Sequence, residues 1–333
     1  MTVINISQPG PVRTGAAQAL AVAGGRTLVA GIADTTPRLL TIPTYDGNPQ
    51  VTHPDVVYWP KSGYNWWMAF TPFPFAAREN PSIVASVDGV TWEVPTGLTN
   101  PVVSQEWAAN ETGVANEYNS DTDLHIQGTK LVMMWKLGIG WWYRVDTTDG
   151  INWTDPVRIT VEGVPLDPVA NDETLSPAVT VEADGTFALW AVDNTTSQVF
   201  RHTSTDGVDW SARQNCTMTP NLNRKWHVDV VRDGGTHHML LQFGNGLTST
   251  VTYWKSTDGG LTWTGSDTPI FDSSEVDLEM EGTLLYGSYR SSFVVRPDGR
   301  FDIFAALMHG VEGSSAGARK WRIALYPYVT PPT

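Results

Sequence analysis

The sequence predicts an all-β protein in which one sheet unit repeats around a ring: a five-bladed β-propeller of four-stranded antiparallel blades. A short phrase recurs as SVDGVTW (86–92), TTDGINW (147–153), STDGVDW (204–210) and STDGGLTW (256–263). A fixed phrase at a spacing of roughly 50 to 60 residues indicates one repeated structural unit. Charged residues make up only 17% of the chain, while Trp reaches 15 and Gly 30, which is typical of many short strands and tight turns.

A second repeat gives the number of units. A glycine turn between two apolar runs lies before each phrase and once more near the C-terminus, at Gly63, Gly128, Gly185, Gly234 and Gly299. Such links indicate β-hairpins. In each unit one strand precedes the turn, a second follows it, a third runs into the phrase, and a fourth starts at the Trp of the phrase. The predicted blades are about 53–98, 119–160, 176–216, 226–270 and 288–329.

The two ends of the propeller, 37–333, are predicted to meet. The last unit lacks the phrase, and its third strand at 321–328 runs almost to the end of the chain. We expect 37–43 to pair there as an N-terminal strand that completes the last blade. Closing the ring removes exposed sheet edges. Residues 1–36 are then an N-terminal arm with a strand-like piece at 27–32, and docking is a hypothesis for it.

Composition limits the partners. The net charge of −14 argues against binding to nucleic acid or to an anionic membrane, because such binding needs clustered cations. Cys216 is the single cysteine, so an intrachain disulfide is excluded. The chain opens without a signal-peptide pattern and contains no apolar run of membrane-span length, so we expect neither export by that route nor membrane insertion. No cofactor is expected.

Polar residues open the first strand of most predicted blades and should gather at one mouth of the channel. Asp55, Asp123 and Asp229 stand at matching places, and His53 and His227 each stand two residues before an Asp. Three roles remain open for each Asp: capping backbone N–H groups, contacting a sugar without catalysis, or catalysis.

The histidines allow two interpretations. His53, His125 and His227 could ligate a metal or a water on the axis, since imidazole and carboxylate are common ligands. Their spacing matches no metal motif, so we predict hydrogen-bonded polar histidines and no metal.

Aromatic and charged residues extend the predicted sugar-binding surface. Aromatic faces stack on sugars, and the long loop at 97–118 carries two of them. The predicted ligand-binding residues are His53, Asp121, Trp107, Tyr118, Trp226, His227, Tyr289 and Arg290.

The repeated phrase resembles the Asp box of sialidase-like β-propellers, whose position between the third and fourth strands implies a structural role. The ring as a whole resembles five-bladed glycosidases of the arabinanase and β-xylosidase type. That resemblance implies an Asp base and a Glu acid, about 6.5–9.5 Å apart in inverting enzymes, with a further Asp that tunes the acid. Asp55 matches the base, and Asp123 or Asp229 the tuning Asp. No Glu opens an inner strand, so Glu173 is the substitute for the acid.

A narrower resemblance rests on HPDV (53–56), AFTP (69–72), ENPSIVAS (79–86), YNSD (118–121), WHVD (226–229) and YRSSF (289–293). These phrases resemble propeller domains in tail proteins of phages that infect Gram-positive or actinobacterial hosts. The resemblance implies a minor tail protein of the virion, assembled in the host cytoplasm, that contacts other tail proteins and recognises a cell-surface glycan. The alternatives are an inverting glycoside hydrolase acting on cell-wall polysaccharide and a structural tail scaffold. A homo-oligomer remains open.

Overall fold

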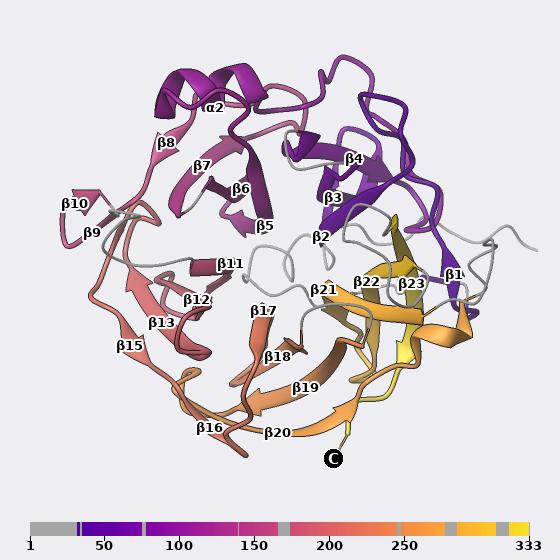
Figure 1. Cartoon of the computed structure of the whole chain (residues 1–333), viewed down its shortest axis with the longest axis vertical. Helices are drawn as coiled ribbons and strands as arrows, with labels where there is room; N and C mark the ends of the chain where they lie inside the picture. The colour runs from indigo at the N-terminus through magenta and orange to yellow at the C-terminus, as the bar shows by residue number, and fades with distance from the viewer. Residues whose placement is uncertain are drawn as a thin grey trace, which may run out of the picture.

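The strands of this chain form sheets that stand side by side around a central axis (Figure 1). The computed structural model describes residues 32–33, 35–74, 78–138, 140–165, 174–244, 248–276, 285–310 and 320–332. Within these ranges there are five sheets, and the inner strand of each contacts the inner strands of both neighbours. The ring is therefore closed, and the all-β propeller fold predicted from the sequence is confirmed.

Each sheet starts at the axis and its next strands step outward. The inner strands are β2 (Val51–Lys61), β5 (Asn119–Gln127), β11 (Thr174–Val181), β17 (Lys225–Asp233) and β21 (Leu285–Val295). The second strands are β3 (Tyr64–Pro72), β6 (Lys130–Leu137), β12 (Phe187–Asp193), β18 (Thr236–Phe243) and β22 (Phe301–Gly310). The third strands are β4 (Ser82–Ser86), β7 (Trp141–Thr147), β13 (Gln198–Ser204), β19 (Thr250–Ser256) and β23 (Lys320–Val329). All of these pairings are antiparallel.

The outer edges depart from the predicted pattern of four antiparallel strands. The first sheet has three strands, and only an isolated bridge between Ala85 and Glu93 stands at the fourth place. In the second sheet β8 (Val157–Arg158) is the fourth strand. The expectation of four strands in every blade is therefore wrong for the first sheet.

Linkers between sheets add further strands at two outer edges. The linker strand β9 (Thr160–Val161) runs parallel to β14 (Asp209–Trp210) of the next sheet and forms a hairpin with β10 (Val164–Pro165). In the same way β16 (Thr217–Thr219) runs parallel to β20 (Thr262–Pro269). A short strand, β15 (Gln214–Asn215), pairs with β13. The outer edges thereby satisfy backbone groups and tie neighbouring sheets together.

The N-terminal closing strand is present. β1 (Arg38–Leu39) pairs antiparallel with β23, and Leu40 N donates to Ile323 O at 2.9 Å. Ile32 belongs to the predicted arm, yet its side chain is buried in the core between the first and last sheets, and Arg296 donates to its carbonyl at 3.3 Å. The end of the arm is thus part of the ring. Residues 1–31, with most of the strand-like piece, lie outside the described residues.

The core is divided among the interfaces between sheets. Each of five apolar clusters in the described residues combines side chains from two neighbouring sheets. In β3, Trp67 and Ala69 pack toward the second sheet, whereas Trp66, Met68 and Phe70 pack toward the last. Since both faces of a sheet are buried, successive residues are apolar and the strands read as continuous apolar runs.

The loop at 97–118 contains a helix that the sequence did not predict. Helix α2 (Gln105–Thr112) begins after Ser104, whose side chain accepts from Trp107 N, and ends at Gly113 with a φ of 72°. These are a usual N-cap and C-cap. The 3₁₀ turn η2 (Ser273–Glu275) lies between β20 and β21.

Candidate functional site

Each inner strand has a β-bulge near its N-terminal end, and these bulges position polar side chains at the axis. Register shifts interrupt the pairing of all five inner strands there. In β2, β5 and β11 the first bulge residues, His53, Asp121 and Ser176, have φ values of 50°, 54° and 55°. A left-handed backbone at a non-glycine residue costs about 1–3 kcal/mol and persists where its surroundings hold it. Three such residues at equivalent places make this end of the channel the candidate site.

A His–Asp–His cluster combines side chains from three different sheets: His53, Asp121 and His227. Asp121 Oδ1 lies 3.1 Å from His53 Nε2 and 3.7 Å from His227 Nδ1. Ser176 Oγ is hydrogen-bonded to His227 Nδ1, and the Ser176 N–H donates to Asp121 Oδ2 at 3.3 Å. Tyr289 covers the cluster, with its ring centroid 4.5 Å from that of His227 and 5.5 Å from that of His53.

Burial sets the charge of this cluster. It lowers the pKa of His53 to about 4 and that of His227 well below its ordinary range, although Asp121 opposes both shifts. Burial also acts to raise the pKa of Asp121, but the neighbouring histidine, Lys136 and Arg290 charges prevail and lower it. At neutral pH the cluster therefore holds two neutral imidazoles and one carboxylate.

These donors fit a divalent metal ion. The three ligand atoms lie within 4.8 Å of one another. Two ligands about 2.1 Å from a tetrahedral metal lie about 3.4 Å apart, close to the 3.1 Å that separates His53 Nε2 from Asp121 Oδ1. Metal ligands must be deprotonated, as these are. Among the described residues, the buried His227 Nε2 has no hydrogen-bond partner. The sequence-based prediction of no metal considered His53, His125 and His227 and did not group Asp121 with them.

A second buried carboxyl, Glu79, lies beside the cluster. Its Oε1 is 3.4 Å from His53 Nδ1, and its backbone carbonyl accepts from Asn119 N at 2.8 Å. Burial raises the pKa of Glu79 well above its ordinary range, the negative Asp121 adds to this, and Lys136 opposes it. A carboxyl whose pKa is raised is suited to general acid–base chemistry.

The three predicted catalytic aspartates form a separate cluster. Oxygen atoms of Asp55, Asp123 and Asp229 lie within 4.8 Å of one another, and all three side chains are fully buried. Asp123 Oδ1 accepts from Val179 N at 2.9 Å, and Asp229 Oδ2 accepts from Phe293 N at 3.1 Å. Each of these two carboxylates thus binds the backbone of the next inner strand, the capping role that the sequence left open.

This geometry does not favour hydrolysis by the aspartates. Their separation is below the roughly 6.5–9.5 Å that an inverting pair needs for a water molecule. Arg290 Nη2 lies 3.6 Å from Asp55 and donates to Pro177 O at 3.0 Å, so this buried side chain links inner strands. Glu173, the predicted acid, lies outside the described residues. Catalytic roles for these four carboxyls stay predictions.

Of the aromatic residues predicted to bind sugar in the loop at 97–118 and in β17, one lies at the cluster. Trp107 packs against Trp135 and Tyr143, with ring centroids 5.8 and 5.0 Å away, so its place in α2 is explained by the core. Tyr118 is half-buried at the end of the same loop. Trp226 is at the site, because its Nε1 donates to the Tyr289 hydroxyl at 3.4 Å.

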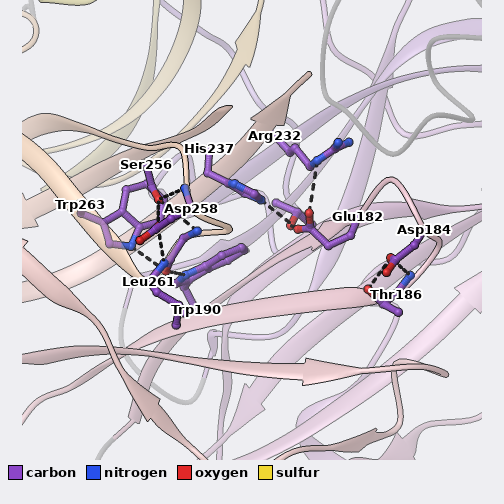
Figure 2. Close-up of polar contacts among 12 residues, drawn as sticks. Glu182, Asp184, Thr186, Trp190, Arg232, His237, Ser256, Asp258, Leu261 and Trp263 are labelled. Atoms are coloured by element: carbon purple, nitrogen blue, oxygen red, sulfur yellow. Dashed lines mark hydrogen bonds and ion pairs between the residues drawn. The ribbon is translucent and has the colours of Figure 1, made fainter. Parts of the chain in front are cut away.

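The Asp boxes lie away from the cluster and join neighbouring sheets. In the fourth box, Ser256 Oγ donates to Asp258 Oδ1 at 2.7 Å (Figure 2). Trp190 of the third sheet and Trp263 of the box both donate through Nε1 to Gly260 O, at 2.8 and 2.9 Å. These contacts hold one sheet against the next, as expected for a structural turn.

The known proteins that the chain resembles are carbohydrate-active enzymes. No family model matches the chain. A curated relative is 37% identical over 129 residues: the A type blood N-acetyl-alpha-D-galactosamine deacetylase of Flavonifractor plautii. The match spans 37% of this chain and 15% of that relative's length.

Solved structures share the fold. The crystal structure of an N-acetylgalactosamine deacetylase from F. plautii, in complex with blood group B trisaccharide, gives a TM-score of 0.69 at 22% identity, covering 89% of this chain and 96% of that one. The catalytic domain of the Coprinopsis cinerea GH62 alpha-L-arabinofuranosidase gives 0.61 at 13% identity, covering 87% and 95%. The GH43 BlXynB protein of Bacillus licheniformis gives 0.55 at 12% identity, covering 85% and 56%.

Sequence reasoning found all three residues of the cluster but missed Glu79 beside it and Lys136, whose charge acts on both Asp121 and Glu79. Both are buried, yet neither opens an inner strand: Glu79 lies between β3 and β4, and Lys136 is near the end of β6. The one available signal was an ionisable residue within or beside an apolar run. No helix in the described residues is long and apolar enough to span a membrane.

Proposed function

We propose that this chain is a metal-dependent deacetylase that hydrolyses the N-acetyl group of an amino sugar in a glycan. The observation that carries the proposal is the His–Asp–His cluster with Glu79 beside it: two neutral imidazoles, one carboxylate and a carboxyl of raised pKa in one buried site. The deacetylase activity named for the F. plautii relative supports the choice of an amide.

The reaction adds water across an amide bond. The water oxygen bonds to the acyl carbon, the C–N bond breaks, and acetate and a free sugar amine leave. A divalent cation held by His53, Asp121 and His227 would supply Lewis acidity and lower the pKa of a bound water to about 7.

The side chains of the site have distinct roles in this scheme. Glu79, as carboxylate, accepts the proton of the attacking water and then delivers it to the departing nitrogen. Burial raises the pKa of Tyr289, with a further contribution from Asp121, so its hydroxyl keeps its proton and can donate to the developing oxyanion. Ser176 holds His227 through Nδ1.

We also propose that the ring has five blades. The five sheets of the described residues, and the five apolar clusters between neighbouring sheets, support this number. The first blade then has a single bridge in place of its outer strand.

The test is release of acetate from N-acetylhexosamine glycosides, including the blood group A trisaccharide, measured before and after chelation. We expect activity that chelation abolishes and a divalent cation restores. His227→Gln and Asp121→Asn should lose it, while His238→Gln, which removes a histidine bonded to Tyr253 in another part of the ring, should keep it. Acetate release that survives chelation would refute the metal.

The phage tail origin, the virion location, tail-protein partners and a homo-oligomer stay predictions, since none of the relatives described above carries them. Recognition of a glycan without hydrolysis is the alternative if no acetate is released, and the half-buried Trp226 beside the cluster favours it.

A further inference from the structure

A hollow opens next to the His–Asp–His cluster. It has a volume of about 380 Å³ and lies where the turn between β12 and β13 meets the start of β17. The residues that line it are Asn194, Ser197, Arg224, Lys225, Trp226 and Gly244. None of these is acidic, although the chain as a whole carries a net charge of −14.

The two cations of the hollow differ in what they can bind. Lys225 is buried, and its Nζ donates to the Ser197 and Leu222 carbonyls and to Asn221 Oδ1, so its hydrogens are used within the fold. Arg224 is exposed and has no ion-pair or side-chain hydrogen-bond partner among the described residues. Its backbone has a φ of 66°, and its carbonyl accepts from Gly244 N at 2.9 Å. The fold thus holds the Arg224 backbone, while no partner among the described residues engages its guanidinium.

Trp226 connects the hollow to the cluster. One part of this side chain lines the hollow, while its Nε1 reaches the hydroxyl of Tyr289. Its ring centroid is 6.1 Å from that of His227. A ligand that extends from the cluster across Trp226 would therefore enter the hollow, where the exposed guanidinium of Arg224 lies.

We infer that the hollow is a subsite for an acidic sugar, a uronate residue linked to the sugar that reacts. The guanidinium of Arg224 is a planar fork that matches a carboxylate, and Trp226 offers an aromatic surface to the sugar ring. The inference rests on the proposed function for the adjoining sugar, and it names the class of glycan: a heteropolymer with alternating acidic and N-acetylated residues.

The test compares two probes: a tetrasaccharide of alternating glucuronate and N-acetylglucosamine, and its carboxyl-reduced form. Binding is measured by calorimetry and turnover by acetate release, on the full chain loaded with metal. We expect the acidic probe to bind about tenfold more tightly. Arg224→Gln should abolish this preference and Arg224→Lys should keep part of it. Lys255→Gln removes one exposed positive charge from β19 and should leave the preference unchanged.

Equal binding of the two probes by the wild type, or an undiminished preference in a folded Arg224→Gln protein, would overturn the subsite. Thermal melting of each variant shows whether it is folded. A preference for the acidic probe without any acetate release would instead uphold the subsite and refute the deacetylase, so the two proposals fail separately.

Discussion

Glu79 is the residue whose chemistry is easiest to isolate. Replacing it with Gln keeps the size of the side chain and removes the group that moves the proton. We expect the acetate-release rate to fall by about 10²- to 10⁴-fold, which is the usual contribution of general acid–base catalysis. Because Glu79 is outside the proposed ligand set, the metal content measured by elemental analysis should not change. A variant with wild-type turnover would contradict the role of Glu79.

Asp121 shows why single residues were hard to assign from the sequence. The sequence pairs each His with the Asp two positions later, His53 with Asp55 and His227 with Asp229. The bulge in each inner strand changes this pattern, and the histidines meet Asp121 of a third strand instead. A bulge depends on the partner strand as well as on local sequence, so its position could not be read from the chain alone.

Gly150, the glycine of the second Asp box, allows a test of how the Asp box packs against the preceding sheet. A Cβ on Gly150 would lie 2.0 Å from the Trp67 ring of the preceding sheet, whereas a Cβ on Gly185 would meet nothing within 4 Å. The two glycines have similar φ values of 80° and 85°. Gly185→Ala should cost about 1–2 kcal/mol for the backbone alone. Gly150→Ala should lower the free energy of unfolding by about 1–3 kcal/mol more than Gly185→Ala, as measured by denaturant unfolding. Equal losses of stability in the two variants would contradict the packing role of Gly150.

An ion cluster between the third and fourth sheets predicts a pH dependence (Figure 2). Glu182 lies 2.9 Å from His237 Nε2 and 3.2 Å from Arg232 Nε. Burial acts to raise the pKa of Glu182, but the hydrogen bond and charge of His237 and the charge of Arg232 lower it overall. A lowered folded-state pKa contributes stability that is present above the unfolded value, near 4.5, and is lost as the pH falls through the folded value.

We therefore expect the melting temperature of the wild type to fall more steeply below pH 4.5 than that of Glu182→Gln, which lacks the titrating group. At neutral pH the variant should be less stable by about 1 kcal/mol, a modest loss because the pair is partly exposed. Parallel pH profiles for the two proteins would show that the titration of Glu182 adds no pH-dependent stability.

At the scale of the elements, the sequence predicted the inner, second and third strands well. Their apolar runs and glycine turns are local signals, and both faces of each sheet are buried. The outer strands were predicted poorly, because β9 and β16 are recruited from linkers by parallel pairing with the next sheet. That pairing has no local signature. Helix α2 was missed for a related reason: its eight residues carry caps but little apolar periodicity.

Closure of the whole ring depends on the segment before the first sheet. A chain that begins at residue 32 retains Ile32 and β1. A chain that begins at residue 44 loses both of these and the buried Leu40 and Ile42, and it exposes the edge of β23. We expect the longer form to melt as the full chain does, and the shorter form to melt lower and to aggregate, because an open edge pairs with other chains. Light scattering during thermal melting checks this, and a soluble, equally stable shorter form would contradict it.

The central claim is that His53, Asp121 and His227 hold one catalytic metal ion, and a metal titration tests it most directly. Metal-stripped wild-type protein is titrated with a divalent cation while acetate release from an N-acetylhexosamine glycoside is followed. The rate should rise in proportion to added metal and level off at about one equivalent, and Asp121→Asn should stay inactive over the same range. A stripped wild type that is already fully active, or an Asp121→Asn protein that is activated equally, would contradict the claim.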